Sequence, residues 1–103
     1  MDPRQLEPQA ELLKALAHPV RLCIVRGLLD GECNVGHIQD CLGLPQSTIS
    51  NHLAVLRSKG ILRAERRGIQ VCYSVADRRA GEIVQILVDR QGVPEEGNRG
   101  GSR

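Results

Sequence analysis

Three side chains that bind soft metal ions recur at intervals of four residues, at Cys33, His37 and Cys41. If a helix begins early enough to include Cys33, this interval places all three along one side of it. Thiolate and imidazole ligands suit Zn²⁺, Cd²⁺, Pb²⁺ or Cu(I), and three thiolates suit As(III). Cys23 is a further thiol, and the charge of nearby Arg26 would favour its thiolate and hence a reversible disulfide. The sequence therefore offers a metal, metalloid or redox site.

These side chains also have a plainer interpretation. A buried cysteine often behaves as a small hydrophobic residue, which fits Cys41 three residues after Ile38. Cys72 lies beside Tyr73 on an expected strand and is predicted to be structural, and His37 could be a solvated helix residue. No Cys-x-x-Cys spacing occurs, which argues against a zinc ribbon or a thioredoxin-like site. Whether any cysteine is functional stays open from the sequence.

A second set of side chains is suited to hydrogen bonding. The segment from Gln46 to Arg57 has apolar residues at helical spacing (Ile49, Leu53 and Leu56), which predict one buried side. Its other residues carry short polar groups that can point outwards: Ser47, Thr48, Ser50, Asn51 and His52. The major groove of DNA admits one α-helix, asparagine suits adenine, and Ser or Thr can meet bases or phosphates. A merely solvated polar face would have the same composition.

Positive charge gathers immediately after this segment, although the formal net charge of the chain is only +2. From residue 57 to residue 67 a single acid, Glu65, stands among five bases: Arg57, Lys59, Arg63, Arg66 and Arg67. A basic segment on a nearly neutral protein suits a surface that meets phosphates. Taken alone, it could equally be a solvated charged face.

The expected elements place both groups of side chains. Apolar spacing, prolines and glycines predict four helices, then two strands joined around Arg67-Gly68, then a last helix. The helices are expected over residues 8–17, from Pro19 to a stop at Asp30-Gly31, and over 35–42, 46–58 and 79–91, and the strands over 61–66 and 69–75. The fourth helix could begin with Pro45 as a first-turn residue or with Ser47 as its cap. The fold class is mainly α with a β-hairpin, in the order of a winged helix-turn-helix.

Length and composition favour one small domain that pairs with a copy of itself. The chain has 103 residues, one Tyr and neither Trp nor Phe, so its core would be marginal alone. Residues 1–92 are predicted to form the domain, and 93–103 a disordered tail. The first and last helices carry more apolar residues than one core can use, which predicts a homodimer interface at Leu6, Leu12, Leu13, Ile83, Ile86 and Leu87. With no apolar run for a membrane or signal peptide, a cytoplasmic protein is expected.

Three segments carry a resemblance to a known family. LKALAHPVRLCIV, LGLPQSTISNHLAVLRSKGIL and RRGIQVCYSV resemble, in that order, the start of the second helix, the recognition helix and the wing of ArsR/SmtB repressors. The resemblance covers about residues 12–88. It implies a homodimer that blocks promoters on double-stranded DNA until a metal ion, metalloid or thiol oxidant binds. DNA contacts are then expected from Gln46, Ser47, Thr48, Ser50, Asn51, His52, Arg57, Arg66, Arg67 and Gln70.

The sequence departs from this family where inducers bind. Arsenic- and cadmium-type members have a Cys-Val-Cys run at the third helix, where this chain has Asn34-Val35-Gly36. Zinc, cobalt and nickel sensors need Asp and His pairs on the last helix, and no His follows His52 here. Cys23, Cys33, Cys41 and His37 remain as candidates. The rival hypotheses are a protein–protein winged-helix module, a DNA-binding regulator without thiol sensing, and a small thiol enzyme, for which no nucleophile–base–orienter set is found.

Overall fold

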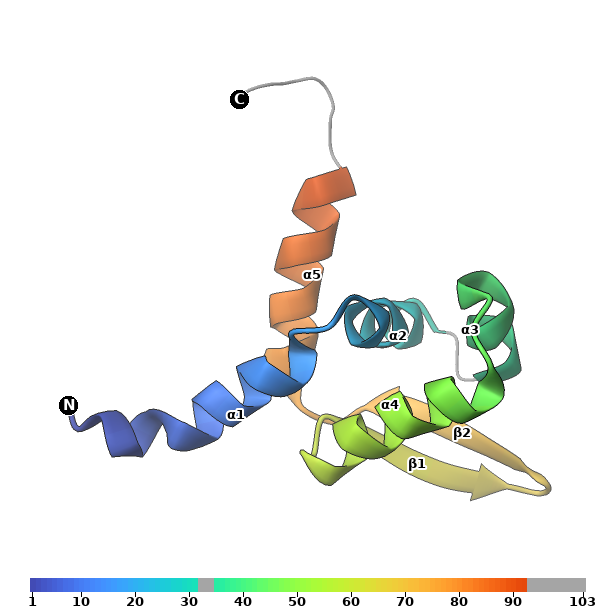
Figure 1. Cartoon of the computed structure of the whole chain (residues 1–103), viewed down its shortest axis with the longest axis horizontal. Helices are drawn as coiled ribbons and strands as arrows, with labels where there is room; N and C mark the ends of the chain where they lie inside the picture. The colour runs from blue at the N-terminus through green and yellow to red at the C-terminus, as the bar shows by residue number, and fades with distance from the viewer. Residues whose placement is uncertain (32–34, 93–103) are drawn as a thin grey trace.

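The computed structural model describes residues 1–31 and 35–92, so the predicted tail at 93–103 lies outside the described residues. Figure 1 shows helices around a central α2, with a two-stranded hairpin beside α4. In chain order the elements are η1 (Pro3–Leu6), α1 (Glu7–Leu16), α2 (Pro19–Leu29), α3 (Val35–Leu42), α4 (Gln46–Ser58), β1 (Leu62–Arg67), β2 (Gln70–Val75) and α5 (Arg78–Gly92). The predicted fold class, mainly helical with one hairpin, is confirmed.

The junction between α1 and α2 is set by His18-Pro19. A residue that precedes proline avoids the helical region, and His18 is extended with φ −156° and ψ 129°. Its imidazole Nδ1 accepts a hydrogen bond from the Val20 N–H at 3.1 Å and so caps the first turn of α2. Helix α1 therefore ends at Leu16, one residue before the predicted end.

The helix-turn-helix of α3 and α4 follows the predicted bounds. Gly43 ends α3 with φ 68°, a left-handed conformation in which a side chain would be strained. Pro45 is the N-cap of α4, and its carbonyl accepts from the N–H groups of Thr48 and Ile49. No side chain caps this helix, so the predicted cap at Ser47 is wrong, and Pro45 precedes the first turn, which begins at Gln46, instead of lying within it. Gly60, with φ 75°, follows the end of α4.

The hairpin is an antiparallel pair in which Arg67 faces Gln70 and Leu62 faces Val75. This register leaves Gly68 and Ile69 as a two-residue turn, so the turn is centred one residue later than predicted. Gly68 has φ 65°, as such tight turns require at their first central position. The strands themselves differ from the predicted bounds by one residue at three of their four ends.

The core is aliphatic and draws on nearly every element. The most deeply buried side chains are Ile24 and Val25 on α2, Ile49 and Leu56 on α4, and, among others, Val84 on α5. Tyr73 packs against this cluster but is only partly buried. Helix α2 contacts α1, α3, α4, α5 and β2, so it is the element on which the others are assembled. None of the described helices is long and apolar enough to cross a membrane.

Two sequence expectations about apolar residues are corrected here. Leu12 was predicted at a dimer interface, yet it is buried in the chain's own core, because α1 packs through Leu12, Ala15 and Leu16, which share one helical side. On α5, Ala80 and Val84 are fully buried, and the half-buried Ile83 packs against the same core, so Ile83 is only partly free for the predicted interface. Ile86 and Leu87 are exposed.

Candidate nucleic-acid interface

Helix α4 has one buried side and one polar side. Ile49, Leu53 and Leu56 are at most 3% exposed. The opposite side is exposed and consists of Gln46, Ser47, Ser50, Asn51, Ala54, Arg57 and Ser58. Thr48 is half-buried on the flank between them. The side that faces solvent therefore offers short hydroxyl and amide groups on a helix whose orientation the core fixes.

His52 does not share this outward orientation. Its side chain is half-buried, its Nδ1 accepts a hydrogen bond from Arg21 Nε at 3.2 Å, and its ring centroid lies 4.4 Å from that of His18. Burial, followed by the charges of His18 and Arg21, lowers the pKa of His52 below its ordinary value. The predicted DNA contact by His52 is thus corrected: the packing of α2 against this flank of α4 turns the imidazole inwards.

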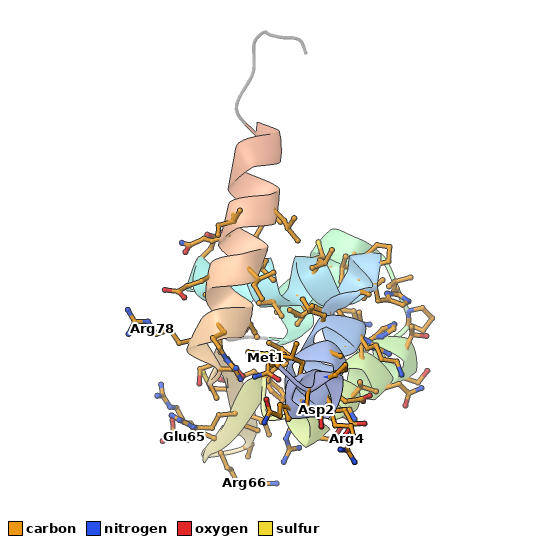
Figure 2. All side chains as sticks on the ribbon, turned by 90° about the vertical axis from the view of Figure 1, so that its left-hand side faces the viewer. Met1, Asp2, Arg4, Glu65, Arg66 and Arg78 are labelled. Atoms are coloured by element: carbon orange, nitrogen blue, oxygen red, sulfur yellow. The ribbon has the colours of Figure 1, made fainter. Side chains whose placement is uncertain are left out.

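The wing presents the second part of the site. Arg63, Arg66, Arg67 and Gln70 are all exposed, and Arg67 Nη2 lies 3.1 Å from Glu65 Oε1. Figure 2 shows Arg66 extending from the lower edge of the molecule, away from its body. At the turn itself Ile69 is 97% exposed. Strand β1 contacts α4, and Figure 1 shows the hairpin running back along α4, with its turn toward the start of that helix.

The charges of this region are only partly neutralised. Lys59 Nζ lies 3.2 Å from Glu11 Oε1 on α1, and Arg67 pairs with Glu65. Within residues 1–31 and 35–92, no carboxylate lies within ion-pair distance of Arg57, Arg63 or Arg66. Three exposed guanidinium groups, one on α4 and two on β1, are therefore available to phosphates.

The predicted sensing residues are not assembled by the structure. Cys23 is exposed on α2 and Cys72 is half-buried on β2. Cys33 lies outside the described residues, as do the side chains of His37 and Cys41. Where side chains are described, no three potential metal ligands converge. Sensing by Cys23, Cys33, His37 and Cys41 stays a prediction.

Arg21 is a residue of this region that the sequence did not predict. Its guanidinium donates from Nη1 to the Ala15 carbonyl on α1 at 3.2 Å and from Nε to His52 on α4. The Ala15 carbonyl is one of the last four of α1, which have no partner inside the helix. In the sequence, the one sign of this role is that a charged residue, Arg21, stands between the apolar residues Val20 and Leu22.

Charge removal at the wing gives a prediction about salt. Replacing Arg66 and Arg67 by glutamine should weaken binding to any duplex. Log affinity falls linearly as log salt rises, and the replacement should make this fall less steep, by about one in slope for each phosphate that the wing no longer neutralises. Fluorescence anisotropy over a salt series measures this slope. The matched control is Arg78 and Arg79 to glutamine, at the start of α5. An unchanged slope in the wing variant would exclude the wing from the phosphate contacts.

A helix-turn-helix with an exposed polar side on its second helix, followed by a basic hairpin, defines a winged-helix DNA-binding domain. A family model described as "Bacterial regulatory protein, arsR family" matches residues 18–64 of this chain. Together with the relatives below, this shows that the chain belongs to the ArsR family of bacterial transcriptional regulators.

The relatives and solved structures that resemble this chain are transcriptional regulators of the same family. The chain is 43% identical over 83 residues to the transcriptional repressor PagR of Bacillus anthracis, covering 80% of this chain and 83% of PagR. It is 45% identical over 83 residues to the regulator CmtR of Mycobacterium tuberculosis, covering 77% and 70%. The structure of reduced HlyU from Vibrio cholerae superposes with a TM-score of 0.79 at 32% identity, covering 85% and 93%.

These comparisons decide between the rival hypotheses of the sequence analysis. The chain is a DNA-binding transcriptional repressor and not an enzyme. A thiol enzyme and a winged-helix module that never touches DNA are thereby set aside.

Proposed function

We propose that this repressor binds its operator as a homodimer, through two α4 helices and two wings, and leaves it when an inducer reacts with cysteine thiols. The observation that carries the DNA-binding surface is the exposed polar side of α4, which includes Arg57, together with the exposed Arg63 and Arg66 of the wing. A regulator of transcription works where the chromosome is, so the proposed compartment is the cytoplasm.

The proposed contacts divide into two groups. Gln46, Ser47, Ser50 and Asn51 would face base edges, with Thr48 at the margin of the contact because it is half-buried. Phosphate contacts would come from the end of α4 and from the wing, namely Arg57, Arg66, Arg67 and Gln70. Base contacts would set the operator sequence, and phosphate contacts the overall affinity.

The proposed dimer is supported by apolar side chains that one chain leaves uncovered. Leu13 on α1 is 53% exposed, and Ile86 and Leu87 on α5 are 58% and 55% exposed. Leu6 is 44% exposed, and α1 contacts α5. Burying these side chains against a second copy would stabilise a chain whose own core is small. Two-fold symmetry would then space the two α4 helices by about 34 Å, one turn of DNA.

The proposed inducer is a thiophilic metal or metalloid, or an oxidant that joins two cysteines. Cys23 is exposed and so can react, and the reduced state is specified for the HlyU relative. Cys33, His37 and Cys41 would supply the other ligands or the second thiol. Because α2 contacts both α3 and α4, a change there would reach the recognition helix. A coupling of about 1–3 kcal/mol would change DNA affinity about 5- to 150-fold.

One experiment tests both parts. The reduced protein is titrated into a duplex carrying its own promoter, and into duplexes selected from a random library, with a shuffled duplex as competitor. Tighter binding to the promoter or selected duplex supports the repressor proposal, and equal binding to all three contradicts it.

The titration is then repeated with Zn²⁺, Cd²⁺, arsenite and a mild oxidant. The change in DNA binding on these treatments should be lost in Cys23→Ser, Cys33→Ser and Cys41→Ser. It should remain in Cys72→Ser, whose cysteine is half-buried. The thiol proposal fails if no treatment alters binding.

A further inference from the structure

A polar cluster joins three helices at the inner flank of the recognition helix. The Arg21 guanidinium on α2 lies between α1 and α4, donating to the Ala15 carbonyl and to His52 Nδ1, both at 3.2 Å. The ring of His18, at the junction of α1 and α2, lies against that of His52 with centroids 4.4 Å apart. In addition to the aliphatic core, the His52 imidazole thus connects α4 to α2 and, through Arg21, to α1.

The hydrogen bond from Arg21 depends on the protonation state of His52. His52 Nδ1 accepts from Arg21 Nε at 3.2 Å. A ring nitrogen that accepts a hydrogen bond carries no proton, so this hydrogen bond needs a neutral His52 imidazole with its hydrogen on Nε2. A second proton on the ring would have to occupy the nitrogen that now accepts. Protonation of His52 and this hydrogen bond therefore exclude each other.

The groups that face the His52 ring oppose its protonation. The guanidinium of Arg21 faces this ring from α2, and the imidazole of His18 faces it from the α1–α2 junction. From α1, the Ala15 carbonyl accepts a hydrogen bond from Arg21. No carboxylate of the described residues is bonded to the His52 imidazole.

We propose that His52 is a positioning residue whose neutral form holds the recognition helix through Arg21, and that protonation of His52 in mildly acidic solution releases the operator. The next residues on the same helix, Ser50 and Asn51, face solvent on the side that is proposed to read DNA. When His52 is charged, Arg21 loses its acceptor and the two cations repel. The flank of α4 then separates from α2, and its polar side no longer matches the groove. The inference rests on operator binding by α4.

The direction of the effect on stability follows from the pKa of His52, which lies below its ordinary value of 6.5 in the folded chain. The unfolded chain then takes up a proton before the folded chain does. The stability that this imidazole supports is complete above pH 6.5 and declines as the pH falls through and below that value. Acid should therefore loosen the cluster while the aliphatic core remains.

The test is a pH profile of specific binding at constant ionic strength. Affinities for the promoter or selected duplex and for the shuffled duplex are measured from pH 7.5 to pH 5.5 with the full chain, and their ratio is taken. This ratio removes the general gain in affinity for DNA that added positive charge produces. For the wild type the ratio should fall about tenfold, within the range of common coupling effects.

Variants then distinguish a role of His52 in positioning α4 from a general effect on the stability of the fold. Asparagine can place an acceptor where Nδ1 was but does not titrate, so His52→Asn should match the wild type at pH 7.5 and keep its ratio at pH 5.5. Arg21→Met should bind weakly at both pH values. Arg26→Met removes the same charge from an exposed position of α2 and should behave as the wild type. NMR titration of the imidazole should show a higher pKa for His52 in Arg21→Met.

The outcomes are distinguishable from a failure of operator binding itself. If the wild type shows no preference for the promoter or selected duplex at pH 7.5, the repressor proposal fails. If that preference exists but does not change with pH, or falls equally in His52→Asn, the positioning proposal is overturned. Far-UV circular dichroism at pH 5.5 checks that each variant is still folded during the measurement.

Discussion

Replacing Ser50 and Asn51 by alanine is expected to lower the affinity for the operator by about 30-fold or more, since each good base contact contributes about 1–3 kcal/mol of discrimination. Both side chains lie on the exposed side of α4, opposite Ile49 and Leu53. Affinity for a shuffled duplex should stay within about twofold, because phosphate contacts supply nearly all non-specific binding. Competition titrations with the two duplexes measure both quantities.

The same helix provides a matched control for this variant. Ser58 is also exposed on α4, but its hydroxyl donates to the Val55 carbonyl at 2.7 Å in the last turn. Ser58→Ala should therefore leave the discrimination between duplexes unchanged. Equal losses in Ser58→Ala and in the double variant, or a loss of non-specific affinity alone, would show that this side of α4 does not read base sequence.

Placing a carboxylate in the exposed apolar surface of α5, by Leu87→Asp, is expected to give monomers and to weaken operator binding by about 100-fold or more. Leu87 is 55% exposed in one chain, so the change should cost a single chain little folding stability. In a dimer the charge would be buried against apolar side chains, which is costly. A monomer also loses the gain in affinity that two linked recognition helices provide. Sedimentation equilibrium and operator titration measure the two effects.

A charge placed elsewhere on α5 separates the dimer from general effects. Gln85 is exposed too, but it lines the open hollow of about 340 Å³ beside Leu29 and Val75. Gln85→Asp adds the same charge and should remain dimeric with unchanged operator affinity. Should Leu87→Asp stay dimeric at low micromolar concentration, the proposed interface on α1 and α5 would be wrong. Thermal melts of both variants verify that the chains are folded.

Most of the fold could be predicted because its signals are local. The apolar spacing from Gln46 to Ser58 gave the bounds of α4, and Gly43 and Gly60 lie in the left-handed conformations expected after a helix. The hairpin followed from the change to alternating residues. Its turn was displaced by one residue, because only the register, in which Arg67 faces Gln70, decides which two residues remain unpaired.

The parts that the sequence did not predict depend on contacts between distant residues. His52 is polar and lies at the border between the buried and exposed sides of α4, where helical spacing cannot tell solvent from a neighbouring helix. It is the docking of α2, with Arg21 and His18, that turns it inwards. Leu12 and Leu13 are adjacent in sequence, yet one is 7% and the other 53% exposed, because α1 packs on only one of its sides.

Helix α1 is bound to the recognition helix at two places, through Arg21 between the Ala15 carbonyl and His52 and through Lys59 with Glu11. In the proposed dimer, α1 would also meet the second copy, so the packing of two α1 helices would fix the relative rotation of the two reading helices. One base pair of B-DNA adds roughly 35° of twist, since about 10 pairs complete a turn. A small shear between the α1 helices would therefore act as a change in operator phasing. Supercoiling of the promoter alters that twist and would therefore change how well the two reading helices of the dimer fit the operator.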